Sequence, residues 1–258
     1  MTSESWAPVY FYETGRSAPI VLICEHASFS LPAEFGALGL TPEAMVSHAA
    51  GDIGALRVAK GLSDALDAPL VYGGVSRLLC DCNRPHGTED AVPARSEIYE
   101  VPGNAGLGAA QRRARCDLIH HPFHQATAGL VEAQQEKASK PIAVVTVHSF
   151  TPVYKGQRRR TEIGFLHDDT ATLSELSLQI EQRHRIYKAD MNQPYDASDG
   201  VTYSLRRHAE ERQLNSTMIE IRNDLIATDE RADRMSAHLA RTLQEAVDKM
   251  HAQGDAAR

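Results

Sequence analysis

The chain has 258 residues, of which 42% are hydrophobic, and its formal net charge at pH 7 is -7. This length and composition predict a soluble globular protein with a full core, built as a single domain over residues 1–258. The negative charge argues against sequence-independent nucleic-acid binding, which needs a basic face. No apolar run approaches the roughly 18 residues of a membrane span. We therefore expect a small-molecule partner, and neither nucleic acid nor membrane.

The cysteines and one cationic run add expectations about the compartment and the surface. Cys24, Cys80, Cys82 and Cys116 form no CxxC pair, and no signal peptide is recognisable at the start. We expect them to be reduced, as in the cytoplasm. The run KGQRRR, residues 155–160, fits a solvated loop or a loop facing an anion, and the solvated loop is the preferred interpretation.

The first strong pattern is PIVLICEHASF, residues 19–29. Its five apolar residues from Ile20 to Cys24 predict a short strand buried on both faces. Glu25 and His26 follow directly, at the carboxyl end of that strand, where open α/β sheets bind their ligands. A single histidine is a weak signal, so simple loop capping is the alternative for these two residues.

The segment after this strand reads as helical. Thr41, Pro42 and Glu43 predict the start of an amphipathic helix that continues to Leu66. On such a helix His48 and Asp52 lie one turn apart on the same face. Two short strands and a long surface loop are predicted next, at residues 69–73, 78–82 and 84–104.

Helices and strands continue to alternate in the second half. A long helix is expected over residues 108–137, kinked or divided by Pro122. The strongest strand pattern, residues 141–148, ends in His148. Further elements are predicted as strands at 162–166, around Ile186 and at 217–222, and as helices at 202–212 and 229–252. This alternation predicts a three-layer α/β/α fold with a mostly parallel sheet.

Several polar residues interrupt the predicted buried strands or follow their ends, and burying any of them unpaired would cost several kcal/mol. We therefore expect them to share a site: Glu25, His26, Asp81, Asn83, Arg84, His148, Glu220 and Arg222. Two histidines with one carboxylate match a catalytic zinc site, whose fourth position stays open. A further carboxylate would take a proton from water. The alternative is a buried salt-bridge network without metal.

Seven blocks in the same order resemble the N-formylglutamate amidohydrolase family: EHAS, HAAGDIG, SRLLCDCNRP, VPGN, TVHSF, NQPY and IEIRNDL. They span residues 19–225. More distantly, DCNRP is similar to the Asn-Arg motif of zinc carboxypeptidases and aspartoacylase-like enzymes. The resemblance implies a phosphorylase/hydrolase-like α/β/α fold with a mostly parallel mixed sheet. It also implies a zinc-dependent amidohydrolase that cleaves a small N-acyl amino acid such as N-formylglutamate.

The resemblance also implies roles for individual residues. His26 and His148 match zinc ligands, Glu220 resembles the general base, and Arg77 is similar in spacing to the arginine that polarises the scissile carbonyl. The remaining matches are to substrate-binding residues: Asn83, Arg84, Arg222, Asn192 and Tyr195. Arginine suits this role because its planar fork binds a carboxylate through two hydrogen bonds.

Two carboxylates are candidates for the third zinc ligand. Carboxypeptidase-like enzymes use a His-x-x-Glu pair, but Phe29 stands three residues after His26. Asp52 is preferred to Glu25, because on an extended chain Glu25 would point to the opposite face from His26. His48 would then support the site or replace a ligand.

Two function classes compete with the zinc amidohydrolase. A metal-free binding protein for small carboxylates would keep the arginines and give the histidines structural roles. A serine or cysteine hydrolase is the weaker alternative. Ser28 and Ser149 each follow a histidine block, but neither stands in a GxSxG elbow.

Overall fold

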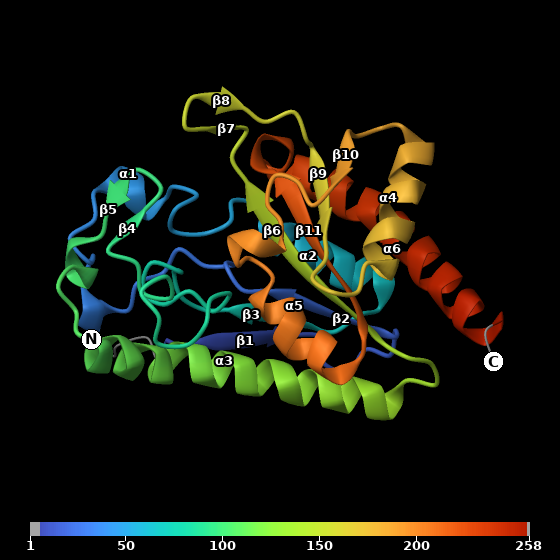
Figure 1. The fold of residues 1–258 in the computed structure, drawn as a ribbon, viewed down its shortest axis with the longest axis horizontal. Helices are drawn as coiled ribbons and strands as arrows, with labels where there is room; N and C mark the ends of the chain where they lie inside the picture. Colours follow the sequence, from blue (N-terminus) through green and yellow to red (C-terminus); the bar gives the residue numbers. More distant parts are fainter. Residues whose placement is uncertain (1–5, 257–258) are drawn as a thin grey trace.

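The computed structural model describes residues 6–256, and Figure 1 shows one large sheet flanked by helices. The strands of this sheet are β1 (Val9–Tyr12), β2 (Ile20–Cys24), β3 (Leu70–Gly73), β6 (Ala143–Phe150), β9 (Ile163–Leu166), β10 (Ala189–Met191) and β11 (Asn215–Arg222). The helices are α1 (Pro42–Met45), α2 (Ala55–Leu66), α3 (Ala109–Lys137), α4 (Thr172–His184), α5 (Tyr203–His208) and α6 (Asp229–Ala256). Two small hairpins stand apart from the sheet, β4 (Arg95–Ser96) with β5 (Tyr99–Glu100) and β7 (Val153–Tyr154) with β8 (Gln157–Arg158).

The sheet is mixed and mostly parallel, with strand order β1-β3-β2-β6-β11-β9-β10. β2 pairs in parallel with both β3 and β6, and β6 pairs in parallel with β11. β1 runs antiparallel to β3, and β9 runs antiparallel to β11. Every residue of β2, β6 and β9 is buried, as the apolar runs predict for strands covered on both faces.

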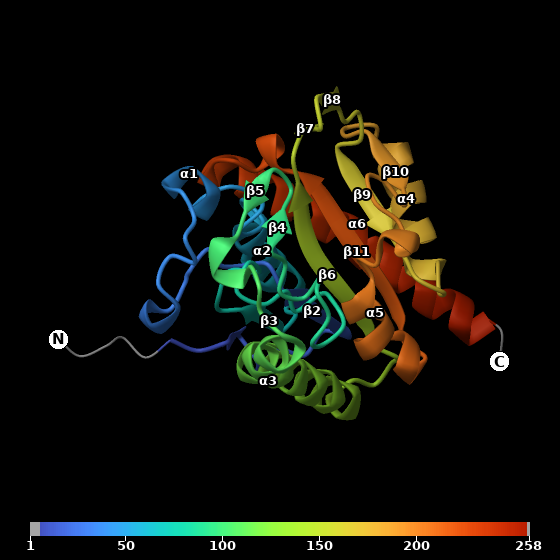
Figure 2. The same ribbon diagram turned by 60° about the vertical axis from the view of Figure 1, so that its left-hand side comes forward.

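Helices cover both faces of the sheet, which confirms the predicted three-layer fold. α3 lies along one face, and α2, α4 and α6 lie on the other (Figures 1 and 2). Consecutive side chains of β2 point to opposite faces of the sheet, because side chains alternate along a strand. Val21 shares a core cluster with Phe123 of α3, whereas Leu22 shares one with Leu62 of α2 and Leu239 of α6. Within residues 6–256, no helix is long and apolar enough to cross a membrane.

The helix expected from Thr41 to Leu66 is interrupted. Thr41 does cap a helix, accepting a hydrogen bond from the backbone N–H of Ala44, but α1 ends after one turn. α2 begins only after Gly54, whose φ of 79° lies in the left-handed region. A Cβ at Gly54 would also collide with the backbone oxygen of Ile226. His48 and Asp52 therefore lie in an irregular segment between two helices, not on one helix face.

Other predicted elements differ from the structure in ways that local pattern does not reveal. Residues 78–82 form turns instead of a strand, although the apolar residues among them are buried. Pro122 lies inside one uninterrupted α3. The strand predicted around Ile186 forms three residues later, as β10, and Ile186 itself is exposed. The edge strand β1 was not predicted.

Candidate active site

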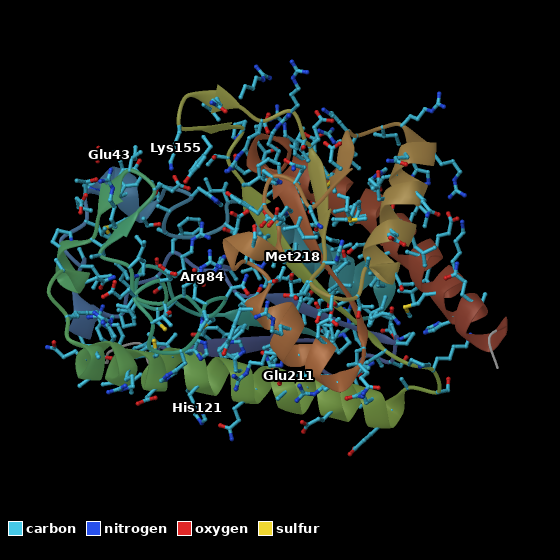
Figure 3. All side chains as sticks on the ribbon, viewed as in Figure 1. Glu43, Arg84, His121, Lys155, Glu211 and Met218 are labelled. Carbon is cyan, nitrogen blue, oxygen red and sulfur yellow. The ribbon has the colours of Figure 1, made fainter. Side chains whose placement is uncertain are left out.

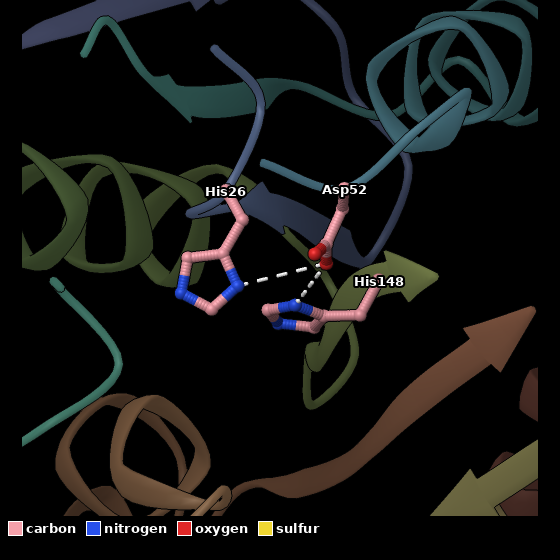
Figure 4. A group of neighbouring side chains, drawn as sticks. All are labelled: His26, Asp52 and His148. Carbon is pink, nitrogen blue, oxygen red and sulfur yellow. Dashed lines mark hydrogen bonds and ion pairs between the residues drawn. The ribbon is translucent and has the colours of Figure 1, made fainter. Parts of the chain in front are cut away.

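Three buried side chains from separate parts of the chain meet at the carboxyl edge of the sheet. His26 follows β2, His148 lies in β6, and Asp52 comes from the segment between α1 and α2 (Figure 4). Asp52 Oδ2 lies 2.9 Å from Nδ1 of His148 and 3.6 Å from Nδ1 of His26. Their possible ligand atoms all lie within 4.8 Å of one another. The geometry therefore brings together the three residues predicted as metal ligands.

The outer nitrogen of each imidazole contacts a second carboxylate. His26 Nε2 lies 2.7 Å from Asp81 Oδ1, and His148 Nε2 lies 3.0 Å from Glu25 Oε2. Metal-binding histidines are typically oriented this way, because the outer carboxylate fixes the ring and strengthens the ligand. Glu25 does not point away from the site as expected. Residues 25 and 26 form a turn after β2 ends, so strand alternation no longer applies to them.

The electrostatics of this group favour a bound cation. Burial would lower the pKa of His148, but Glu25 and Asp52 outweigh it and raise that pKa well above its usual range. Burial opposes a similar rise at His26, whose pKa is raised mainly by Asp81. Oδ1 of Asp52 is buried and forms an ion pair with Arg77, but it accepts no hydrogen bond within the described chain. The carboxylates that raise the pKa of these imidazoles would also attract a metal ion, which would displace the proton from each nitrogen that it binds. Two imidazoles and one carboxylate are ligands that zinc accepts, so the donor set fits zinc.

Arg77 is the residue nearest to this group that carries a fixed positive charge. Its Nη2 lies 3.2 Å from Asp52 Oδ1, and its Nη1 lies 3.1 Å from Nδ1 of His26. His48 contacts both Asp52 and Arg77, with Nδ1 3.6 Å from Asp52 Oδ1 and Nε2 3.3 Å from Nη2 of Arg77. Burial, with Arg77 next, lowers the pKa of His48 to about 3, so this imidazole is neutral. Arg77 is positioned to stabilise negative charge that develops beside the three-residue group.

Glu220 lies on the strand next to His148 and directly opposite it in the parallel register of β11 and β6. It lines the same cavity, and burial raises its pKa to about 7, with a further contribution from Asp52. Within the described chain its Oε2 has no hydrogen-bond partner. Arg222, two residues along, instead pairs with Glu162 and Asp224. Glu220 is therefore available to accept a proton, which general-base catalysis near neutral pH requires.

These groups open into a cavity of about 800 Å³. Its cationic lining residues are Arg77, Arg84, Arg95, Lys155, Arg158 and Arg159. Four of them, Arg84, Lys155, Arg158 and Arg159, form no ion pair with any carboxylate in residues 6–256, and of these four only Arg84 and Arg159 are partly buried. Arg84, labelled in Figure 3, donates from Nη1 to the backbone oxygens of Asn83 at 3.0 Å and Gly200 at 2.8 Å. Both guanidinium groups can therefore bind an anionic ligand.

The other residues predicted to bind substrate fall into two groups. Tyr195 and Asn83 line the cavity, although the side chain of Asn83 is engaged by backbone groups of Val201 and Ser204. Burial and Glu220 raise the pKa of Tyr195 to about 12, so its phenol remains a hydrogen-bond donor. Arg222 and Asn192 do not line the cavity, and Asn192 bonds instead to His167.

Arg159 is a site residue that sequence reasoning did not identify. It belongs to the cationic run after β6, for which a solvated loop was the preferred interpretation. In the structure its guanidinium carbon lies 4.6 Å from the ring centroid of Tyr154 and 4.8 Å from that of Tyr195. Stacking on aromatic faces holds an arginine in place while leaving its fork free. The alternative of an anion-facing loop is therefore supported at Arg159.

Comparison with known proteins identifies the family of this chain. The family model described as N-formylglutamate amidohydrolase matches residues 18–227. The chain belongs to this family. No curated protein matches it. Family membership and the fold confirm the resemblance read from the seven sequence blocks, and the buried His26, Asp52 and His148 provide a possible metal site.

Solved structures extend the comparison. A gene product from Agrobacterium tumefaciens is 40% identical, with 95% of this chain and 96% of that chain covered and a TM-score of 0.90. The N-formylglutamate amidohydrolase from Ralstonia eutropha shares the fold at 20% identity, with 96% and 99% covered and a TM-score of 0.60. The succinylglutamate desuccinylase from Chromobacterium violaceum is more remote, at 13% identity, 92% and 64% coverage and a TM-score of 0.44.

Proposed function

We propose that this member of the N-formylglutamate amidohydrolase family is a zinc-dependent enzyme that hydrolyses the amide of a small, acidic N-acyl amino acid. N-formylglutamate is the reference substrate of this class. One observation carries the proposal. His26 and His148 both contact Asp52, and the outer nitrogen of each imidazole contacts a further carboxylate. The proton acceptor Glu220 and guanidinium groups without a carboxylate partner line the same cavity.

In this proposal His26, Asp52 and His148 hold the ion. When bound, it would polarise the scissile carbonyl and make a water molecule more acidic. Asp81 and Glu25 keep the two imidazoles oriented through their outer nitrogens.

Glu220 is proposed as the general base and acid. It would accept a proton from the attacking water as the new C–O bond forms at the carbonyl carbon. It would then return the proton to the amine nitrogen as the C–N bond breaks, giving a carboxylic acid and a free amino acid. The guanidinium group of Arg77 would stabilise the negative charge that develops on the carbonyl oxygen.

Arg84 and Arg159 are proposed to bind the substrate carboxylates. An acidic N-acyl amino acid carries two carboxylates, one on the α-carbon and one on the side chain, and the cavity offers two partly buried guanidinium groups without a carboxylate partner. Tyr195 stacks on Arg159 and can donate a hydrogen bond to the same ligand.

One observation favours a metal-free binding protein as a second candidate. Arg77 contacts both Asp52 and His26, so a protein cation already offsets part of the charge of the three-residue group. Only the amidohydrolase candidate requires a bound metal ion, so the metal dependence of its activity distinguishes it from the binding-protein candidate.

The direct test is a hydrolysis screen of metal-stripped and zinc-reloaded protein against N-formyl, N-acetyl and N-succinyl derivatives of glutamate, aspartate and alanine. We expect the stripped protein to be inactive, zinc to restore activity, and the acidic amino acids to be preferred, measured as free amine released. Binding of these compounds without hydrolysis by zinc-loaded protein would support the binding-protein candidate instead.

Substitution of the unpaired arginines tests substrate recognition. Arg84→Lys and Arg159→Lys keep the charge but lose the planar fork, so we expect KM for an acidic substrate to rise about tenfold with a smaller change in kcat. A charged hydrogen bond contributes about 1.5–3 kcal/mol, so the alanine variants should raise KM roughly 10–100-fold. Arg160→Lys is the matched control, because Arg160 does not line the cavity. An unchanged KM in both alanine variants would exclude these residues from carboxylate binding.

We also propose that the chain is one domain that works in a reducing compartment such as the cytoplasm. The four cysteines are all buried and free, which supports that environment.

A further inference from the structure

A second group of metal-binding residue types lies between α4 and α6. Glu181 and His184 stand three residues apart on α4 and so share a face, and His238 meets them from α6. Their possible ligand atoms all lie within 4.8 Å of one another. None of the three lines the active-site cavity. The mechanism proposed above uses none of them.

Glu181 is a buried carboxylate that pairs with no lysine or arginine in the described chain. Its side chain is fully buried, and it contacts only Nε2 of His238 at 2.8 Å and the hydroxyl of Thr242 at 2.5 Å. A carboxylate buried in a helix interface is stabilised by a nearby cation. The imidazole of His238 provides that cation when protonated, and a metal ion bound between the same side chains would provide it instead.

His184 supplies a ligand atom with no other role. Its Nδ1 is buried and has no hydrogen-bond partner in the described residues, although the residue as a whole is partly exposed. Its ring centroid lies 5.6 Å from that of His238. The ring centroid of Tyr187 lies 5.0 Å from that of His238, and Tyr187 lines a surface cavity of about 290 Å³. Solvent therefore reaches the immediate neighbourhood of the three residues.

We propose that Glu181, His184 and His238 bind a divalent zinc-class ion that clamps α4 to α6. Two imidazoles and one carboxylate are a donor set that selects zinc over calcium or magnesium, which prefer oxygen ligands. Three protein ligands leave a fourth position for water. Because the ion joins two helices that belong to the same layer, its effect is on the stability of that layer, independent of the reaction at the sheet edge.

The test uses full-length protein in which the active-site ligands are removed, His26→Ala/His148→Ala, so that this second site is measured alone. After stripping and reloading, zinc content by mass spectrometry should be one equivalent in this double variant and close to zero when His184→Ala is added. At free zinc about 100 times the Kd, the Tm of the double variant should rise by roughly 5–10 °C, and this rise should disappear with His184→Ala.

His121→Ala, added to the same double variant, is the matched control, because His121 is exposed on the outer side of α3 (Figure 3). This control should retain the zinc equivalent. Cobalt provides a second readout, since a four-coordinate site gives visible absorption bands that Glu181→Gln and His184→Ala should both abolish. A double variant that binds no zinc and shows no Tm shift, or zinc binding that survives His184→Ala unchanged, overturns the proposal.

Discussion

Replacing Glu220 with glutamine should lower kcat by about 10²–10⁴-fold, the usual cost of losing a positioned general base. The substitution keeps the shape of the side chain but removes its ability to accept a proton. Burial already raises the pKa of Glu220 to about 7, so the folded protein gains little from its charge. We therefore expect Tm to be unchanged or slightly higher, and zinc content to be retained. Steady-state kinetics, thermal melting and metal analysis of the same preparation measure these three effects.

Glu97→Gln is the matched control for Glu220→Gln. Glu97 lines the same cavity and burial raises its pKa as well, but it lies 3.9 Å from His48 and is only partly buried. We expect its substitution to change kcat by less than about tenfold. Near-normal turnover of a folded, zinc-loaded Glu220→Gln protein would refute the assignment of the base.

Asp52→Asn should abolish metal binding at the active site and destabilise the fold. Asp52 is almost fully buried and contacts Arg77 as well as His26 and His148, the two proposed ligand histidines. Burial alone would raise its pKa, but Arg77, followed by His26 and His148, holds it well below the usual range. Asparagine would leave Arg77 without its carboxylate. Breaking a buried pair costs about 3 kcal/mol in unfolding free energy. Denaturant unfolding and zinc titration measure the two losses.

The control for Asp52→Asn removes the same charge elsewhere in the cavity. Asp90 lines it but makes no ion pair with the rest of the described chain, so Asp90→Asn should retain both zinc and stability. Wild-type zinc affinity in Asp52→Asn would show that Asp52 is not a ligand, and Glu25→Gln would then be the next substitution to examine.

The sheet and its ligand edge were predictable because short-range pattern determines them. The apolar runs before His26 and through His148 define strands buried on both faces, and parallel strands end at one edge. Alternation alone places Glu220 and Arg222 on one face of their strand, and the structure adds that this strand pairs with the strand of His148. These residues carry strong local signals, which is why the sequence blocks and the geometry agree on them.

Other parts of the site depend on contacts between distant segments, which local pattern cannot show. Gly54 interrupts the expected helix because it packs against Ile226, so Asp52 reaches the site from an irregular segment. Glu25 turns towards His148 because the chain leaves strand geometry at that residue. Arg159 stood in a cationic run that resembles a solvated loop, and only its packing on Tyr154 and Tyr195 reveals its position.

The cavity is lined both by residues of the central sheet and by residues of loops, and this difference bears on how the protein could change during evolution. His148 and Glu220 face each other on adjacent strands, whereas Arg159 and Lys155 belong to a hairpin outside the sheet. Loops accept insertions and exchanges that central strands do not. With the roles proposed for Glu220 and Arg159, new ligand preferences could therefore arise by remodelling the hairpin while the groups on the central strands keep their spacing.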